Sequence, residues 1–230
     1  MYVLEELRKR YGNANGGVDA LDGVDLTIDD GEFIAIQGPT GQGKSTLLQM
    51  LGGMDRPTGG RATYDGLDLG DLSEGALTEL RSREFGFVFQ TFNLIPTLTA
   101  GENVETALVP LGVRGAERRD RAARALAEVG LDHRGSHLPG ELSGGEQQRT
   151  AIARALAKEP RVVLADEPTG NLDQDTRDEI VGLLVELWET HGVTLVVVTH
   201  DDLVAERAPR RLRLEAGRLL AGTGSAPAMP

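Results

Sequence analysis

The sequence predicts an α/β protein built on a mostly parallel β-sheet, and two observations lead to that prediction. Short apolar runs alternate with segments of helical periodicity along most of the chain, which is typical of strands joined by crossover helices. Polar residues directly follow several of these runs, and ligands of parallel sheets bind beyond the carboxyl ends of the strands. We therefore expect a ligand site at one edge of the sheet.

The composition narrows the class of protein. Acidic residues outnumber basic residues by 36 − 24 = 12, whereas a nucleic-acid-binding surface is usually basic, so we expect no nucleic-acid partner. The absence of cysteine excludes disulfides, cysteine-ligated zinc, iron–sulfur clusters and thiol catalysis. The first residues do not resemble a signal peptide, and no apolar run approaches the roughly 18 to 20 residues that cross a bilayer. These features predict a soluble protein and are compatible with the cytosol.

The first part of the chain predicts antiparallel strands. Short apolar runs between residues 2 and 36 are separated by the turn residues Gly16-Gly17 and Asp29-Asp30-Gly31. Tyr11 lies in this part and could stack on a nucleotide base, although its residue type alone favours an ordinary packing role.

Residues 38–46 match the phosphate-binding P-loop, in which a glycine and four free positions precede Gly-Lys-Ser/Thr. The apolar run before them and the helical pattern after them supply the strand–loop–helix context that the motif requires. Glycines let several backbone N–H groups reach one phosphate chain, and the helix N-terminus adds its positive dipole end. Lys44 is expected to contact the β- and γ-phosphates, and the Ser45 hydroxyl is expected to bind Mg²⁺. The predicted nucleotide-contacting residues are Gly38, Pro39, Thr40, Gly41, Gln42, Gly43, Lys44, Ser45 and Thr46.

The middle of the chain adds one polar residue of interest and a helical region. An apolar strand pattern stops at Gln90, which gains meaning only if the P-loop strand lies beside it. Residues 97–142 have a helical pattern, in which Thr99 and Glu102 resemble a capping box and a helix over 117–130 ends at a glycine.

A second glycine-rich helix start follows at Ser143-Gly144-Gly145-Glu146. Backbone N–H groups at a helix N-terminus bind anions, although these residues alone could also form an ordinary cap. Because the same chain carries a P-loop about a hundred residues earlier, we predict that this segment is a second phosphate-binding element.

Two further strand ends carry titratable residues. One apolar run ends in Asp166 and Glu167, and beside a P-loop such an acid organises Mg²⁺ while the next acid can act as a general base. Another apolar run ends in His200, which could reach a γ-phosphate or orient the attacking water. Each could instead be a strand-end residue without chemistry. All three follow strands at the same predicted edge as Gly38 and Gln90, which favours a common site.

The C-terminal part predicts a helix, a hairpin and a tail. Residues 175–189 have one apolar helical face, and residues 211–220 predict a hairpin that turns at Ala216-Gly217. Residues 223–230 are small, polar and proline-bearing, so we expect a disordered tail.

Taken in this order, the motifs resemble those of the ATP-binding subunits of ABC transporters. The resemblance covers almost the whole chain, from about Tyr2 to Leu220, and the Ser-Gly-Gly signature is its most specific motif. Three stretches are similar to the branch that includes the MacB, LolD and FtsE ATPases, namely residues 53–60, 89–96 and 166–173. Three residues depart from the usual pattern without removing a catalytic group, namely Gln42, Gly101 and Glu146.

The resemblance implies a RecA-like core, an N-terminal antiparallel β-subdomain and a helical subdomain at about 91–145, all within a nucleotide-binding domain over 1–222. It implies that ATP and Mg²⁺ are the cofactors, and that Tyr11 stacks on adenine. The residues that it assigns to catalysis are Glu167, His200 and Gln90. The residues that it assigns to Mg²⁺ are Ser45, Gln90 and Asp166.

The resemblance also implies two partners. Two copies would pack head to tail on binding ATP, so that the P-loop of one copy faces Ser143, Gly144, Gly145 and Glu146 of the other, with Asp173 at the dimer seam. A groove beside Gln90 would receive a short helix from a separate membrane permease. The chain would then be cytoplasmic and peripheral, held on the inner face of the cell membrane through that permease.

Three classes of function are compatible with these motifs. The first is an ATPase subunit that powers a membrane permease, as an exporter or a mechanotransmission complex of the MacB and LolD type. Within it, an FtsE-like ATPase that regulates a cell-wall or division complex without transport is the alternative. The second class, ABC-type ATPases of DNA repair or translation, carries coiled coils, zinc cysteines or tandem cassettes, and this sequence has none of them. The third class, a nucleotide-binding scaffold that hydrolyses nothing, is disfavoured by intact Glu167 and His200.

Overall fold

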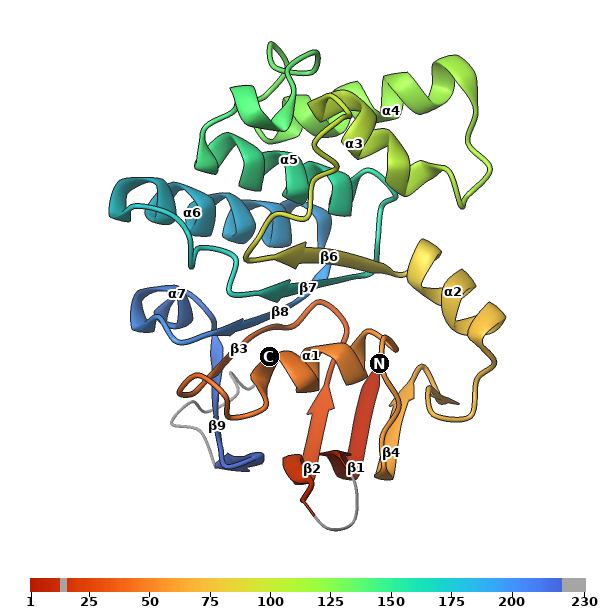
Figure 1. The fold of residues 1–230 in the computed structure, drawn as a ribbon, viewed down its shortest axis with the longest axis vertical. Helices are drawn as coiled ribbons and strands as arrows, with labels where there is room; N and C mark the ends of the chain where they lie inside the picture. The colour runs from red at the N-terminus through yellow and green to blue at the C-terminus, as the bar shows by residue number, and fades with distance from the viewer. Residues whose placement is uncertain (13–15, 221–230) are drawn as a thin grey trace, which may run out of the picture. The chain divides into compact units, whose positions relative to one another are not determined.

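The computed structural model describes residues 1–12 and 16–220 and divides the chain into two compact units (Figure 1). The first unit consists of Met1–Leu77 and the chain from Thr194 onward, and the second consists of Thr78–Val193. The chain passes from the first unit to the second within the helix α2 (Glu74–Arg83). The predicted tail, 223–230, and the last two residues of the predicted domain lie outside the described residues.

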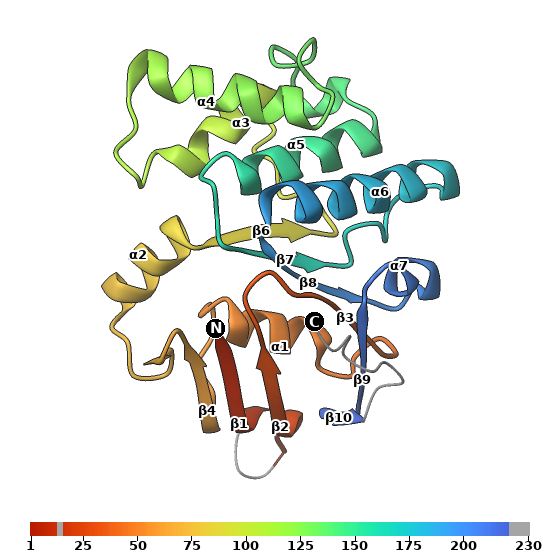
Figure 2. The ribbon, with the colours of Figure 1, turned by 180° about the vertical axis from the view of Figure 1, so that it is seen from behind.

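An antiparallel sheet forms one part of the first unit, and its strands lie side by side in Figures 1 and 2. In hydrogen-bonded order, they are β2 (Val18–Ile28), β1 (Tyr2–Tyr11), β4 (Gly59–Tyr64) and β5 (Leu67–Asp68). Tyr2 on β1 is fully buried, with its ring 4.9 Å from that of Tyr64 on β4 and its hydroxyl donating to the carbonyl of Leu51 at 3.0 Å. The predicted N-terminal antiparallel strands are confirmed, whereas the pairing of β4 with β1 joins distant segments and was not predicted.

Parallel strands carry the P-loop segment in the same unit. β3 (Phe33–Gln37) pairs in parallel with β8 (Thr194–Thr199) on one side and with β9 (Arg210–Glu215) on the other. The strand β10 (Arg218–Leu220) runs antiparallel to β9, which confirms the predicted hairpin. The first four residues of β3 and all of β8 are buried, as expected for strands covered on both faces. Two helices follow these strands, α1 (Lys44–Leu51) after β3 and α7 (Asp202–Glu206) after β8.

The second unit combines a pair of parallel strands with most of the helices. β6 (Phe85–Phe89) and β7 (Val162–Asp166) pair in parallel. The helical elements are α3 (Ala100–Glu105), the 3-10 helix η1 (Thr106–Leu108), α4 (Gly115–Glu128), the 3-10 helix η2 (Pro139–Glu141), α5 (Gly144–Leu156) and α6 (Gln174–His191). The helix α5 contacts β6, α3, α4 and α6, so it is the centre of this unit (Figures 1 and 2).

The stretch predicted as a helical subdomain, 91–145, is described throughout and contains α3, η1, α4 and η2 without a strand. The capping box predicted at the start of α3 is confirmed, because the Thr99 hydroxyl accepts the Glu102 N–H at 3.2 Å and the Glu102 carboxylate accepts the Thr99 N–H at 2.8 Å. The helices α2 and α7 were not predicted. α2 buries only Leu77 and so lacks an apolar stripe, and α7 has only five residues. None of the helices in the described part of the chain is long and apolar enough to cross a bilayer.

Candidate functional site

The P-loop lies between β3 and α1 and forms a backbone cradle that only glycine permits at several positions. Gly41 and Gly43 have φ angles of 81° and 97°, in the left-handed region that costs other residues free energy. A Cβ atom at Gly38 would collide with the carbonyl oxygen of Leu214, and a Cβ atom at Gly43 would collide with that of Ala20. This packing explains why the first and third glycines of the motif are needed.

Lys44 is buried inside this cradle. Its Nζ donates to the carbonyl oxygens of Gly38 at 2.7 Å and of Pro39 at 3.1 Å. Lys44 is also the first residue of α1. The N-cap of α1 is Gly43, and no side chain in the described residues forms a cap hydrogen bond there. The N-terminus of α1 therefore combines helix N–H groups, a positive dipole end and a fixed ammonium, which together suit an anion. The other predicted residues of the loop lie at the surface or half-buried, namely Pro39, Thr40, Gly41, Gln42, Ser45 and Thr46.

Gln42, one of the three residues that depart from the usual pattern, holds the P-loop to another part of the first unit. Its Oε1 accepts the backbone N–H of Ala216 at 2.5 Å, at the turn between β9 and β10. Ala216 has a φ of 46°, which a residue with a Cβ adopts only when its surroundings hold it. This contact could not be predicted because it joins residues 174 positions apart.

Tyr11 lies at the end of β1 and is 41% exposed. Its hydroxyl donates to the Asp55 carboxylate at 2.9 Å, and the Lys9 ammonium lies 4.9 Å from its ring centroid. Burial raises the pKa of Tyr11, and the Asp55 carboxylate raises it further, while a hydrogen bond with Thr46 of the P-loop lowers it. Tyr11 is thus a fixed aromatic ring next to the P-loop, with part of its surface open to solvent.

His200 follows β8 and is exposed. In the pairing of β3 with β8, Gln37 stands opposite Thr199, so Gly38 and His200 follow adjacent strands at the same edge of the sheet. The structure therefore brings His200 and the P-loop together at the carboxyl ends of parallel strands, as predicted from the strand pattern.

The second unit brings Gln90 and the two acids together in the same way. Phe89 stands opposite Asp166 in the pairing of β6 with β7, so Gln90 and Glu167 follow adjacent strands at one edge. The Gln90 Nε2 lies 3.3 Å from the Asn171 Oδ1, and the Asn171 Nδ2 donates to the Gln90 carbonyl at 2.9 Å. Gln90 is therefore held against the turn that follows Glu167.

Glu167 has a φ of 45°, a strained conformation for a residue other than glycine. Two hydrogen bonds brace the turn that it begins. The Gly170 N–H donates to the Glu167 carbonyl at 3.0 Å, and the buried Nε2 of Gln148 donates to the Pro168 carbonyl at 2.6 Å. Strain of this kind persists where the surroundings over-determine the backbone, and it is common at catalytic positions. Gln148 was not predicted, because a glutamine inside a helix has no sequence signal for this contact.

The Ser143–Glu146 segment starts α5 with a complete capping box. The Ser143 Oγ accepts the Glu146 N–H at 3.2 Å, and the Glu146 carboxylate accepts the Ser143 N–H at 2.8 Å and a hydrogen bond from the Arg134 Nε at 2.8 Å. The backbone N–H of Ser143 lowers the pKa of the Glu146 carboxyl, and Arg134 lowers it further. A Cβ atom at Gly145 would collide with Thr176 of α6, so the glycine is needed for packing in this position.

Asp173 is the N-cap of α6. Its carboxylate accepts the Thr176 N–H at 3.0 Å and the Thr176 hydroxyl at 2.8 Å, and the N–H lowers the pKa of this carboxyl. Because Thr176 also touches Gly145, the starts of α5 and α6 lie next to each other, with Ser143 and Asp173 both exposed.

A hollow of about 260 Å³ lies on the second unit beside the segment that follows Gln90. Its floor includes the rings of Phe87 and Phe89, which are stacked with centroids 6.1 Å apart. Arg154 lines it and donates to the carbonyls of Asn93 at 2.5 Å and Phe92 at 2.8 Å. Lys158 also lines it, donates to the Arg81 carbonyl at 2.6 Å, and has its pKa lowered by burial to about 8.

The predicted residues thus form two groups. Tyr11, the P-loop and His200 belong to the first unit, and Gln90, Asp166, Glu167, the Ser143–Glu146 segment and Asp173 belong to the second. The predicted Mg²⁺ ligands are a hydroxyl, an amide and a carboxylate, which are the oxygen donors that this ion prefers. In the described ranges, no three histidine or acidic residues cluster as a metal site.

Comparison with known proteins decides the family. A family model described as ABC transporter matches residues 21–170. The chain belongs to the ABC transporter family. This match covers the P-loop, the Ser143–Glu146 signature and the two acids at the end of β7, so the resemblance inferred from these motifs is confirmed.

Two curated relatives in the ABC transporter family place the chain in the predicted branch. LolD of Geobacter metallireducens, a lipoprotein-releasing system ATP-binding protein, is 50% identical over 219 residues, which are 94% of this chain and 96% of LolD. MacB of Hyphomonas neptunium, a macrolide export ATP-binding/permease protein, is 46% identical over 222 residues, which are 96% of this chain. These residues make up 34% of that MacB, so the chain spans about a third of its length.

A solved ABC structure supports the fold. The dimeric ATP-binding cassette MJ0796, in a post-hydrolysis state bound to ADP and Pi, is 46% identical to the chain with a TM-score of 0.87. The likeness covers 95% of this chain and 96% of that cassette. The predicted fold class, an α/β ABC ATPase, is confirmed.

Proposed function

We propose that the chain is the ATP-hydrolysing subunit of an ABC transporter of the MacB and LolD type and that it powers a separate membrane permease. The observation that carries this proposal is the glycine cradle closed around Lys44, in a chain that also holds Gln90 beside Asp166 and Glu167 at one strand edge. The relative LolD, which the chain matches over nearly its whole length, is named the ATP-binding protein of a lipoprotein-releasing system.

In this function the first unit binds the nucleotide. Lys44 exchanges its contacts with the Gly38 and Pro39 carbonyls for the β- and γ-phosphates, which an ammonium group can do because its three donors are rotatable. The backbone N–H groups of the loop and the N-terminus of α1 surround the phosphate chain. The exposed part of the Tyr11 ring stacks on adenine, and its bond to Asp55 keeps the ring in place.

Hydrolysis further requires a metal ion and a general base. Ser45, Gln90 and Asp166 are the residues that would hold Mg²⁺, which when bound neutralises charge on the phosphates. Glu167 accepts a proton from the attacking water as the general base. His200, which follows the strand adjacent to the P-loop strand, contacts the γ-phosphate or orients that water.

Two copies of the chain complete each other's sites. Ser143, Gly144, Gly145 and Glu146 of one copy cover the nucleotide held by the P-loop of the other, and Asp173 lies at the seam. This arrangement gives a role to the second glycine-rich helix start. The similar cassette MJ0796 is dimeric with ADP and Pi bound, which supports the proposal.

The hollow beside Gln90 is the proposed contact for the permease. Its stacked phenylalanine rings offer an apolar floor, and the Arg154 and Lys158 side chains offer hydrogen-bond donors, which together suit a short helix. The chain would be held through this contact on the cytoplasmic face of the membrane. Purification of the native protein from membranes should recover one permease in equal amount, and a Phe87→Asp variant should lose it.

The sharpest test of the proposed activity is Glu167→Gln, which keeps the side-chain shape and removes the base. ATP hydrolysis should fall about 10²- to 10⁴-fold, because this is the usual contribution of a general base, while ATP affinity stays within about threefold. Phosphate release and nucleotide titration measure the two effects. Size-exclusion chromatography with Mg-ATP should then show a stable dimer, since ATP that is not cleaved stays bound between two copies.

Glu186→Gln is the matched control, because Glu186 is an exposed glutamate on α6 outside the predicted site. It should hydrolyse ATP at the wild-type rate. A Glu167→Gln variant that hydrolyses as fast as this control would remove Glu167 from the catalytic role.

A further inference from the structure

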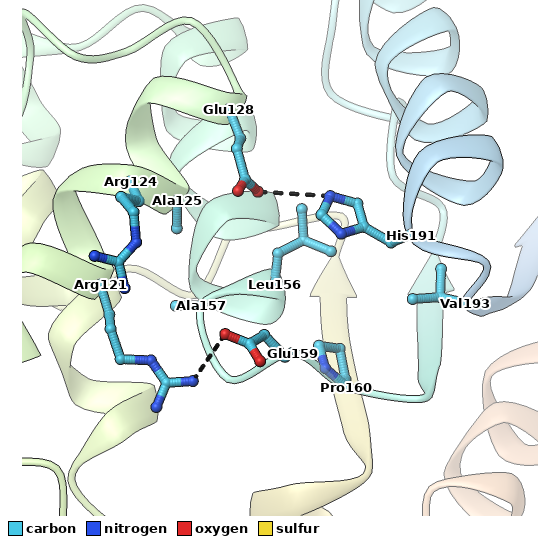
Figure 3. Close-up of a pocket in the computed structure, with 10 residues that line it drawn as sticks. All are labelled: Arg121, Arg124, Ala125, Glu128, Leu156, Ala157, Glu159, Pro160, His191 and Val193. Atoms are coloured by element: carbon cyan, nitrogen blue, oxygen red, sulfur yellow. Dashed lines mark hydrogen bonds and ion pairs between the residues drawn. The ribbon is translucent and has the colours of Figure 1, made fainter.

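The second unit contains a small hollow that none of the predicted nucleotide or permease contacts uses. It has a volume of about 140 Å³ and lies between the last turns of α4 and α6 and the loop that follows α5 (Figure 3). Such a volume is well below the roughly 300–1,000 Å³ of sites for drug-sized ligands, so only a small molecule would fit.

The walls of the hollow combine an apolar floor with a rim of both charges. Leu156, Pro160 and Val193 form buried surface at its base. The rim carries two arginines, two glutamates and one histidine, namely Arg121, Arg124, Glu128, Glu159 and His191. Figure 3 shows the arginines on the α4 side and His191 across the hollow from them.

One cation of the rim has no partner. The Arg121 guanidinium lies 3.2 Å from the Glu159 carboxylate, and the His191 Nε2 lies 3.6 Å from the Glu128 carboxylate (Figure 3). In the part of the chain that the structure describes, Arg124 makes no hydrogen bond or ion pair. A guanidinium of this kind binds a carboxylate with two parallel hydrogen bonds.

Another part of the hollow favours a positively charged group, because helices end there. Three of them end at the hollow, since Glu128, Leu156 and His191 are the last residues of α4, α5 and α6 and all line it. Helix C-termini carry the negative end of the dipole and attract cations. Together with the Glu128 and Glu159 carboxylates, they suit an ammonium group.

We propose that this hollow binds a small zwitterion, an α-amino acid with a short apolar side chain. Its carboxylate pairs with Arg124, its ammonium lies among the helix ends near Glu128, and its side chain covers Leu156 and Val193. A purely anionic ligand would be repelled by the two glutamates, and a purely cationic ligand would be repelled by the two arginines. Each would therefore bind with less favourable free energy than the zwitterion.

Calorimetric titration of the full chain tests the proposal with three molecules of similar shape. L-valine carries both charges, isobutylamine lacks the carboxylate, and 3-methylbutanoate lacks the ammonium. L-valine should bind with a Kd of about 1 mM or tighter, and the other two should bind at least tenfold more weakly. Glycine, alanine, leucine and isoleucine extend the series in side-chain size.

Arg124→Ala should weaken L-valine binding about tenfold or more, because one charge-assisted contact is lost. Arg119→Ala is the matched control, since Arg119 is an exposed arginine on the same helix that does not line this hollow, and it should bind as the wild type does. Both variants should keep the wild-type ATPase rate, which shows that they fold. The proposal is overturned if none of the five amino acids binds at about 10 mM, if the singly charged molecules bind as tightly as valine, or if Arg124→Ala binds like Arg119→Ala.

Discussion

The two glycine-rich helix starts of this chain are similar in sequence and differ in construction. At α1 the N-cap is Gly43, in the left-handed region, and a buried lysine lies inside the loop. At α5 the N-cap is Ser143, in an extended conformation, and the carboxylate of Glu146 already accepts a backbone N–H of the helix start. The first start therefore presents positive charge, and the second presents its own negative charge.

The start of a third helix, α3, allows the capping box of α5 to be compared with one outside the candidate site. The start of α3 has the same capping box as α5, with Thr99 and Glu102 in place of Ser143 and Glu146, and no role in nucleotide binding is proposed for it. The box by itself is thus a means of starting a helix. Under the proposed function, the P-loop binds phosphate by itself, whereas the α5 start contacts a phosphate that is already held by another copy.

Among the changes at the starts of α1 and α5, Lys44→Ala should have the largest effect on ATP binding. Removal of the ammonium inside the cradle should weaken ATP binding by about 10- to 100-fold, the usual loss for hydrogen bonds to a charged group. Nucleotide titration of the isolated chain measures it. Lys158→Ala, which removes a half-buried lysine of the second unit, should leave ATP affinity unchanged. Equal losses in the two variants would mean that Lys44 acts on folding and not on the nucleotide.

Ser143→Arg should affect hydrolysis and spare binding. The larger, charged side chain would block the helix start against the second copy, so ATP affinity of the isolated chain should change by less than about threefold while hydrolysis falls about tenfold or more. Mixtures with Lys44→Ala should keep at most one competent site per mixed dimer. Normal hydrolysis by Ser143→Arg alone would contradict the composite site.

The smallest effect should come from Glu146→Gln. Glutamine keeps the capping box and removes the negative charge from the helix start, so ATP-driven dimers should tighten about two- to fivefold, as expected from roughly 0.3–1 kcal/mol of charge–dipole energy. Analytical ultracentrifugation in the Glu167→Gln background measures the dimer constant. Because the Ser143 N–H lowers the pKa of Glu146, its carboxyl stays ionised from about pH 6 to about pH 8. The tightening of the dimer by Glu146→Gln should therefore not vary with pH in that range.

Glu102→Gln is the matched control for that change. Glu102 accepts the Thr99 N–H in the box of α3, and this hydrogen bond lowers its pKa as well. The substitution should leave the dimer constant unchanged. A gain as large as that of Glu146→Gln would show that both effects come from net charge and not from the helix start.

Much of the local structure around the candidate site could be predicted because its signals are local. The P-loop, the capping box of Thr99 and Glu102, the helix start at Ser143 and the turn at Ala216-Gly217 each depend on a few consecutive residues whose backbone preferences and hydrogen-bonding groups act over short distances. The strand ends were predictable too, since buried apolar runs that end in Gln90, Asp166 or His200 mark the carboxyl ends of parallel strands within each unit.

By itself, the sequence determined the family, the order of the motifs that form the candidate site and the class of the fold, because each of these depends on short motifs and on apolar periodicity. Only the tertiary structure decided how those segments are held. Gln42 binds Ala216, Gln148 binds Pro168, and Arg154 holds the segment after Gln90, and none of these contacts has a signal near its own residues. Each joins a polar side chain to a backbone group brought near by packing. Many polar residues could serve such a group equally well, so the partner is chosen by the fold and not by the local sequence.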